Sequence, residues 1–221
     1  MRAETMIYLS VGTCAMLLPM LLLAKKYGIP VWKTILTGLI LTVTGTISTK
    51  LWFFVENLTF SGRSFYGAVF LVPLAFLVIA SLLRVPYGDA IDLCAPAECV
   101  MLVIMKYQCL TGGCCLGKVL YTNTAGVDVL FPSQIAEAIC ALMIAVVLML
   151  LAQKPGNRGK LFPWYMIIYG ASRFILNLFR ADDRVFLMGM TAGNFWSIIS
   201  VFAAAGWMYL AAEKAMTEKQ D

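Results

Sequence analysis

Long apolar runs separated by short polar segments recur along the whole chain. About 20 apolar residues in helical form are enough to cross a hydrocarbon core of roughly 30 Å. The pattern predicts seven membrane-spanning helices, at Met6–Ala24, Val31–Val55, Phe65–Leu83, Ile91–Tyr107, Gln134–Ala152, Phe162–Leu178 and Ala192–Ala212. The fourth is short and carries Asp92, Pro96, Glu98 and Lys106, which favours a broken or partly interfacial helix.

Composition supports the same class. Of 221 residues, 61% are hydrophobic and 13% are charged, whereas soluble domains are about half apolar and a quarter charged. We therefore expect an all-α polytopic membrane protein whose residues 1–221 form one integral membrane domain. The basic residues lie at the ends of spans without interleaved aromatic residues, which argues against nucleic acid as a partner. Seven cysteines, no histidine and no CxxC pair predict no metal site, and no soluble cofactor is implied.

The basic residues also predict an orientation. An odd number of spans places the termini on opposite sides, and cytoplasmic loops carry the excess of Lys and Arg. An outside N-terminus and a cytoplasmic C-terminus fit best. The cytoplasmic segments then hold Lys25, Lys26, Lys33, Arg84, Lys154, Arg158, Lys160, Lys214 and Lys219, and the external segments hold Arg2, Arg63, Lys118, Arg180 and Arg184.

The segment Lys106–Lys118, which reads KYQCLTGGCCLGK, is the strongest candidate for a site. Its paired glycines permit positive φ and close approach of another chain or a ligand. Irregular backbone beside membrane spans is buried in protein or lines a wet cavity. Cys109, Cys114 and Cys115 admit three readings, as nucleophilic thiols, a disulfide or small packing residues, and packing or a disulfide is favoured.

The sixth span contains a polar face. Arg173, Asn177 and Arg180 are spaced i, i+4, i+7, which predicts a shared helical face. An arginine inside a span costs roughly 2.5–3.5 kcal/mol on insertion scales and so normally faces a cavity or a partner. The guanidinium fork suits a phosphate-bearing lipid headgroup. The alternatives are a structural ion pair of Arg173 with Glu137, Asp92 or Glu98, and an Arg180 that reaches to the membrane interface.

Two further stretches carry polar groups. Ser133 is a plausible N-cap of the fifth span, and Gln134 and Glu137 follow it on neighbouring positions of one helical face. Helix capping alone accounts for that arrangement. Tyr66 opens the third span between two glycines, either as a hydrogen-bonding or acid–base group or as an aromatic anchor at the membrane interface.

The order SFYG, DxxAP, a glycine-rich loop, FPSQxxE and YGxxRFxxNxxR resembles the bacterial prolipoprotein diacylglyceryl transferases, from about Gly45 to Ser200. That family moves a diacylglyceryl group from phosphatidylglycerol to the cysteine thiol of a lipoprotein precursor. The resemblance implies the bacterial cytoplasmic membrane as location, a site facing the external side, and a phospholipid and a precursor peptide as partners. Arg173 matches the family's essential arginine, Glu137 its acid, and Gly113 and Gly117 its signature glycines.

The resemblance implies a full set of site residues. Those with implied catalytic roles are Tyr66, Arg173 and Glu137; those with implied substrate contacts are Lys106, Gly113, Cys114, Gly117, Ser133, Gln134, Asn177 and Arg180. Five positions depart from the family pattern: Tyr66 stands for a histidine, Lys106 for an arginine, Cys109 for an asparagine, Cys114 for a glutamate and Asn177 for an acid. These departures leave open a transferase with another acceptor, a non-catalytic lipid-binding or transport protein, and a thiol redox protein.

Overall fold

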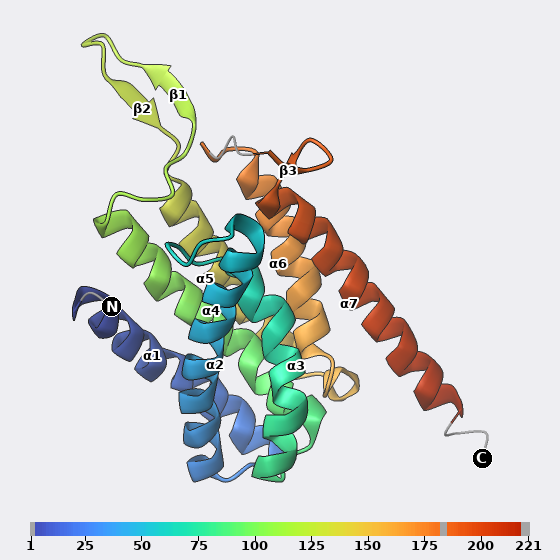
Figure 1. Ribbon diagram of the computed structural model, residues 1–221. Helices are drawn as coiled ribbons and strands as arrows, with labels where there is room; N and C mark the ends of the chain where they lie inside the picture. The colour runs from blue at the N-terminus through green and yellow to red at the C-terminus, as the bar shows by residue number, and fades with distance from the viewer. Residues whose placement is uncertain (1–2, 182–184, 218–221) are drawn as a thin grey trace.

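The computed structural model describes residues 3–181 and 185–217. Three of the residues used to predict the orientation lie outside these ranges: Arg2, Arg184 and Lys219. Lys214 lies in a helix, but its side chain is not described. In this described part of the chain, seven α-helices form a bundle (Figure 1). They are α1 (Ala3–Tyr27), α2 (Val31–Asn57), α3 (Tyr66–Leu83), α4 (Tyr87–Thr111), α5 (Ser133–Leu151), α6 (Leu161–Asn177) and α7 (Ala192–Thr217). Each predicted span is confirmed as a helix.

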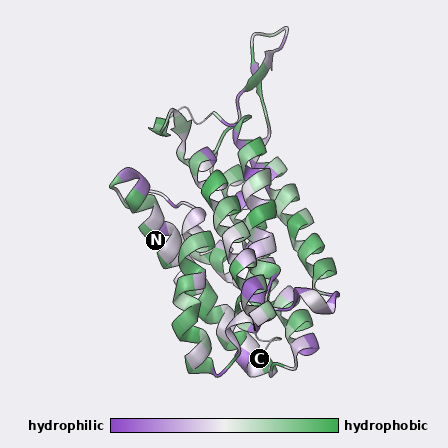
Figure 2. Cartoon of the chain, turned by 90° about the vertical axis from the view of Figure 1, so that its right-hand side faces the viewer, coloured by the Kyte–Doolittle hydropathy of each residue, from purple (hydrophilic) through white to green (hydrophobic). Residues whose placement is uncertain are grey.

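Five helices in the described part of the chain are long and apolar enough to cross a membrane: α1, α2, α3, α5 and α7. Hydrophobic residues run along most of their length, and hydrophilic residues gather near the helix ends and in the loops (Figure 2). Large apolar side chains such as Leu18, Leu82 and Phe202 are exposed on the outside of the bundle. These faces suit a lipid surrounding, since lipid places no penalty on exposed apolar groups.

The fourth helix differs from the expectation of a broken helix. α4 is continuous over 25 residues with Pro96 inside it. It packs against α1, α5, α3 and α6, so its charged side chains face protein. Asp92, Glu98 and Lys106 are all buried. Charges that would be costly against lipid are therefore carried by a helix that other helices surround.

Acidic residues near the start of α4 anchor the start of α6. The Asp92 carboxylate accepts hydrogen bonds from the backbone N–H groups of Gly159 at 2.6 Å and Leu161 at 2.8 Å. It also accepts the Tyr27 hydroxyl at 2.9 Å. Arg158 forms an ion pair with Asp89 at 2.7 Å. Along α4, Asp92 lies about 20 Å from Lys106. Lys106 and Arg173 contact the same carboxylate, that of Glu137, so Asp92 is too far away to form an ion pair with Arg173.

The described residues include two short β-hairpins that were not predicted from the sequence. β1 (Val119–Thr122) pairs antiparallel with β2 (Asp128–Leu130) between α4 and α5, and β3 (Val185–Leu187) pairs with β4 (Met190–Thr191) before α7. The first hairpin projects beyond the helices (Figure 1). Its turn is built locally, because the Asn123 side chain accepts the backbone N–H groups of Ala125 and Val127 and Gly126 has φ +76°.

Gly67 allows the start of α3 to pack directly on α2. A Cβ at this position would overlap the backbone carbonyl of Ser48, so the two helices would have to separate. We expect Gly67→Ala to lower the free energy of unfolding by about 1–3 kcal/mol, the usual cost of overpacking, and to lower the melting temperature by several degrees. Thermal unfolding in detergent measures this. Gly206→Ala in α7, where an added Cβ contacts no described atom within 4 Å, is the matched control, and equal melting of the two variants would contradict the prediction.

Candidate active site

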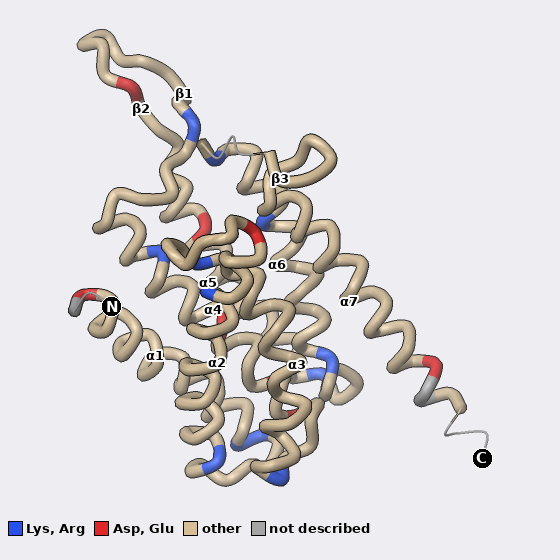
Figure 3. Tube along the Cα trace, viewed as in Figure 1, with Lys and Arg blue, Asp and Glu red and all other residues tan. Residues whose placement is uncertain are grey.

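A cavity of about 1380 Å³ lies among the helices at the end of the bundle where α4 finishes and α5 begins. One part of its wall is apolar and includes Met16, Leu41 and Leu102. The polar part of its wall brings together residues from motifs that are far apart in the sequence: Tyr66, Lys106, Glu137, Arg173 and Arg180. Charged positions gather at two levels of the bundle, and the upper level lies at this end (Figure 3).

Glu137 is the centre of the polar wall. Its Oε2 atom contacts Lys106 Nζ at 2.5 Å and is also in ion-pair contact with Arg173 Nη1. Its Oε1 atom accepts a hydrogen bond from Arg180 Nη1 at 2.5 Å. The Glu137 side chain is only 4% exposed. One buried carboxylate therefore holds three cations that come from α4, α6 and the segment after α6.

The cluster has excess positive charge and an unused hydrogen-bond donor. Three cations against one carboxylate leave a surplus of two positive charges. Among the described residues, the buried Nε of Arg180 has no hydrogen-bond partner, whereas Nη1 of Arg173 is engaged by Glu137. Buried polar groups normally find partners. The geometry therefore suits an anionic group that accepts hydrogen bonds from guanidinium.

Arg180 reaches the cluster by a route that the helical spacing did not predict. α6 ends at Asn177, so Arg180 does not share a helical face with Arg173. It forms a β-bridge with Gly117 instead. Backbone hydrogen bonds from Lys118 N to Phe179 O at 2.9 Å and from Ala181 N to Leu116 O at 3.1 Å hold the two segments together. This pairing of the glycine-rich loop with the end of α6 turns Arg180 inward and leaves it buried rather than at the interface.

Asn177 lies outside the cavity lining. Its Nδ2 atom donates to Thr191 Oγ1 at 2.6 Å and to Asn194 Oδ1 at 3.0 Å. The side chain therefore connects the end of α6 to the start of α7. Arg173 and Asn177 lie one turn apart in α6 as predicted. Only the inclusion of Arg180 in that face is wrong, because helical periodicity no longer applies beyond the end of the helix.

Ser133 and Gln134 hold the loop that follows α4. The Ser133 hydroxyl donates to the Cys115 carbonyl at 2.5 Å, and Gln134 Nε2 donates to the Cys114 carbonyl at 2.6 Å. α5 begins at Ser133 itself with Pro132 as its N-cap, so the predicted N-cap role of Ser133 is wrong. Both side chains reach across to the loop backbone.

The two signature glycines serve different needs. Gly113 has φ +65°, and a Cβ there would contact no described atom within 4 Å. Glycine is therefore favoured at this position by its backbone conformation and not by lack of space. Gly117 packs tightly against the Phe131 carbonyl and has no room for a Cβ. Neither lies on the cavity lining.

Tyr66 is 3% exposed and lines the cavity, which makes the alternative of an interfacial anchor wrong. Its hydroxyl lies 2.5 Å from Ser197 Oγ, and Ser197 donates to the Gly193 carbonyl at 2.7 Å. A serine has one hydroxyl proton, so Tyr66 donates to Ser197 and keeps its own lone pairs free. Ser197 was missed in the sequence because nothing local distinguishes it from other polar residues in α7.

Glu98 is a second residue that was not predicted as a site residue from the sequence. It lines the cavity and is buried, and its carboxylate interacts with the Tyr165 side chain. The sequence feature that could have identified Glu98 is its position as an acidic residue inside an apolar run. It does not pair with Arg173, which contacts Glu137.

Comparison with known proteins agrees with the order of motifs. The sequence matches the model of the prolipoprotein diacylglyceryl transferase family over residues 6–210. A phosphatidylglycerol–prolipoprotein diacylglyceryl transferase of Clostridium tetani is 29% identical over 121 residues, which cover 50% of this chain and 49% of the relative. A protein of the same name from Dehalococcoides mccartyi is 25% identical over 197 residues, covering 78% and 75%.

A third relative of that name, from Geobacter sulfurreducens, is 28% identical over 142 residues, covering 61% of this chain and 54% of the relative. The matched regions thus span from about half to three quarters of the relatives' lengths. The family match extends over nearly the whole chain, from α1 into α7. The chain therefore belongs to the prolipoprotein diacylglyceryl transferase family.

Proposed function

We propose that this protein transfers a diacylglyceryl group from phosphatidylglycerol to the cysteine thiol of a lipoprotein precursor. The observation that carries the proposal is the surplus of positive charge around Glu137 in a cavity with an apolar wall. Family membership and the names of the relatives support the same reaction. We place the site on the external side of the bacterial cytoplasmic membrane, in one integral membrane domain, because of the distribution of loop cations.

A phospholipid fits both walls of the cavity. Lys106, Arg173 and Arg180 would bind the phosphate, since guanidinium groups recognise phosphate oxygens with paired N–H groups. The apolar residues of the wall would contact the acyl chains. Glu137 has both oxygens engaged by cations, so we assign it to positioning them and not to accepting a proton.

The transfer is a displacement at carbon. The sulfur of the precursor cysteine attacks the glyceryl carbon that bears the phosphate ester, a C–S bond forms, and the C–O bond breaks with its electron pair on oxygen. Glycerol phosphate leaves, and the thiol proton passes to the released phosphate or to water. Negative charge grows on the phosphate as the bond breaks, and cations aimed at that charge stabilise the transition state more than the bound substrate.

Tyr66 is the group we assign to the incoming thiol. Its hydroxyl proton is engaged by Ser197, and its oxygen can accept a hydrogen bond from the thiol. A phenol is a weaker proton acceptor than the histidine that the family resemblance implies at this position. The thiol must still lose its proton, since the thiolate is the nucleophile and a free thiol has a pKa of about 8.5.

The test is to incubate purified protein with labelled phosphatidylglycerol and a lipobox peptide, and to measure diacylglyceryl thioether and released glycerol phosphate. The same peptide with serine in place of cysteine is the control and should form no thioether. Folded protein that yields neither product, beside an active family enzyme, would overturn the proposal. Movement of intact labelled lipid between leaflets of a vesicle without release of glycerol phosphate would point to a transporter.

A further inference from the structure

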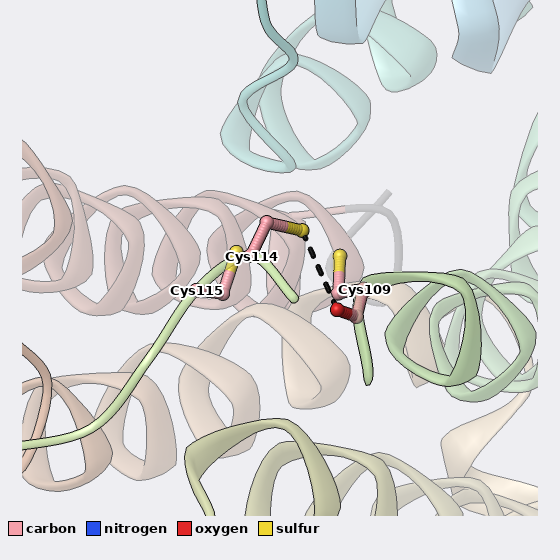
Figure 4. Close-up of side chains that lie close together, drawn as sticks. All are labelled: Cys109, Cys114 and Cys115. Carbon is pink, nitrogen blue, oxygen red and sulfur yellow. Dashed lines mark hydrogen bonds between the residues drawn. The ribbon is translucent and has the colours of Figure 1, made fainter. Parts of the chain in front are cut away.

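Three cysteine sulfurs lie together on the wall of the same cavity. Cys109 belongs to the last turn of α4, and Cys114 and Cys115 belong to the loop that follows. All three Sγ atoms lie within 4.8 Å of one another (Figure 4). All three residues line the cavity, Cys114 is exposed, and the other two are half-buried. The proposed reaction uses the thiol of the substrate, so it assigns these three cysteines no role.

The backbone holds the three side chains in this arrangement. Cys115 has φ +59°, a left-handed conformation that is uncommon for a residue with a side chain. The Cys114 N–H donates to the Cys109 carbonyl at 3.1 Å, which closes the turn. Ser133 and Gln134 fix the carbonyls of Cys115 and Cys114 from α5. A loop tied at these points keeps the sulfurs close without a bond between them.

The spacing of the sulfurs matches a metal ion. A bond of about 2.3 Å from Zn²⁺ to each sulfur requires sulfurs about 3.8 Å apart in tetrahedral geometry. The separations of at most 4.8 Å come within about 1 Å of that distance. Thiolates select thiophilic ions such as Zn²⁺ and Cu⁺. The spacing Cys-x4-Cys-Cys is unlike the CxxC pattern, so the sequence predicted no metal site, and the turn after α4 is what brings the sulfurs together.

Charge favours the same occupant. Three thiolates around a divalent ion carry a net charge of −1. Lys106 lies one helical turn before Cys109, and Arg180 is bridged to Gly117, two residues after Cys115. The cluster around Glu137 has more positive than negative charge, so an anionic metal complex beside it is electrostatically stabilised.

We propose that Cys109, Cys114 and Cys115 bind one Zn²⁺ ion through three thiolates, with the fourth coordination position open to the cavity, and that the thiol of the substrate cysteine takes this position. The second part rests on the proposed function. A thiol bound to a metal ion is deprotonated outright, which supplies the proton loss for which Tyr66 is a weak base. No electron is transferred: the thiol proton leaves to water and the sulfur becomes the fourth ligand.

The first test measures the ion alone. Full-length protein in detergent, reduced and stripped of metal, is titrated with Co²⁺ as a spectroscopic substitute and then with Zn²⁺ as competitor. We expect one ion per chain with sulfur-to-cobalt charge-transfer absorption. Cys109→Ser, Cys114→Ser and Cys115→Ser should each weaken zinc affinity by at least about tenfold, the lower bound even for residues that only support ligands. Cys14→Ser in α1, an exposed cysteine away from the cluster, should change nothing.

Gel filtration and melting temperature verify that the variants fold, so that lost binding reports lost ligands. An absence of thiolate–cobalt absorption in folded, reduced protein would overturn the site. Equal affinity in the three variants and in Cys14→Ser would also overturn it, as would a stable disulfide among the three cysteines that reforms in the presence of Zn²⁺.

The second test adds the lipobox peptide to the cobalt-loaded protein. We expect the absorption spectrum to shift with the cysteine peptide and to stay unchanged with the serine peptide, and this readout needs no turnover. A shift without transferase product would support the metal site while the proposed function failed. Product formed at full rate by metal-free Cys114→Ser protein would instead establish the proposed function and overturn the role of the ion.

Discussion

Replacing Glu137 by glutamine should lower the melting temperature of the protein by about 6–20 °C. The substitution leaves the buried Lys106 and Arg180 and the half-buried Arg173 near one another without the carboxylate that pairs with them. Removing one partner of a buried ion pair typically costs about 3–5 kcal/mol, and for a chain of this length each kcal/mol lowers the melting temperature by about 2–4 °C. Thermal unfolding in detergent at fixed pH and lipid concentration measures the shift.

Two further variants separate electrostatics from general damage. Glu213→Gln near the end of α7 removes an exposed carboxylate and should leave the melting temperature unchanged. The double variant Glu137→Gln, Lys106→Met removes one of the stranded cations and should recover part of the loss. If Glu137→Gln melts like the unmodified protein, Glu137 is not the group that holds the three cations together.

The helices were predictable because the bilayer imposes a simple rule on sequence. Apolar runs identify α1, α2, α3, α5 and α7 directly, and their bounds fall within a few residues of the predicted ones. The predicted break in α4 is wrong. It was inferred because Asp92, Glu98 and Lys106 interrupt the apolar sequence. Hydropathy reports what a helix would cost against lipid, and it cannot report that α1, α2, α3, α5 and α6 all contact this one.

The sequence marked several residues of the cavity wall, and it did not predict how they are arranged in space. Arginine and glutamate within apolar runs mark Arg173 and Glu137 as unusual wherever they lie in space. Their mutual contact is a tertiary event between α5 and α6, and spacing within one element does not encode it. Arg180 could not be placed from the sequence, because its position depends on a β-bridge to Gly117 and not on the periodicity of α6.

Side chains with several possible partners were the hardest to place. Ser133 has the residue type and position of a helix cap, yet its hydroxyl donates to the Cys115 carbonyl. Asn177 follows Arg173 by one turn, yet its amide donates to Thr191 and Asn194. Local capping and distant contacts satisfy the same hydrogen-bonding groups, so the sequence leaves the choice open and only the packed structure decides it.

If the protein is the transferase we propose, Arg173→Ala should lower kcat by about 10²–10³-fold, the usual loss when a group that stabilises transition-state charge is removed. Its effect on folding should be smaller than that of Glu137→Gln, because Glu137 keeps Lys106 and Arg180 as partners.

Arg173→Lys keeps the charge but loses the planar fork, so we expect an intermediate rate. Initial rates with labelled phosphatidylglycerol measure both Arg173 variants, and Lys154→Ala, which removes an exposed cation in the loop after α5, is the matched control. Full activity in folded Arg173→Ala would mean that Lys106 and Arg180 suffice for the phosphate, and that Arg173 serves only to balance Glu137.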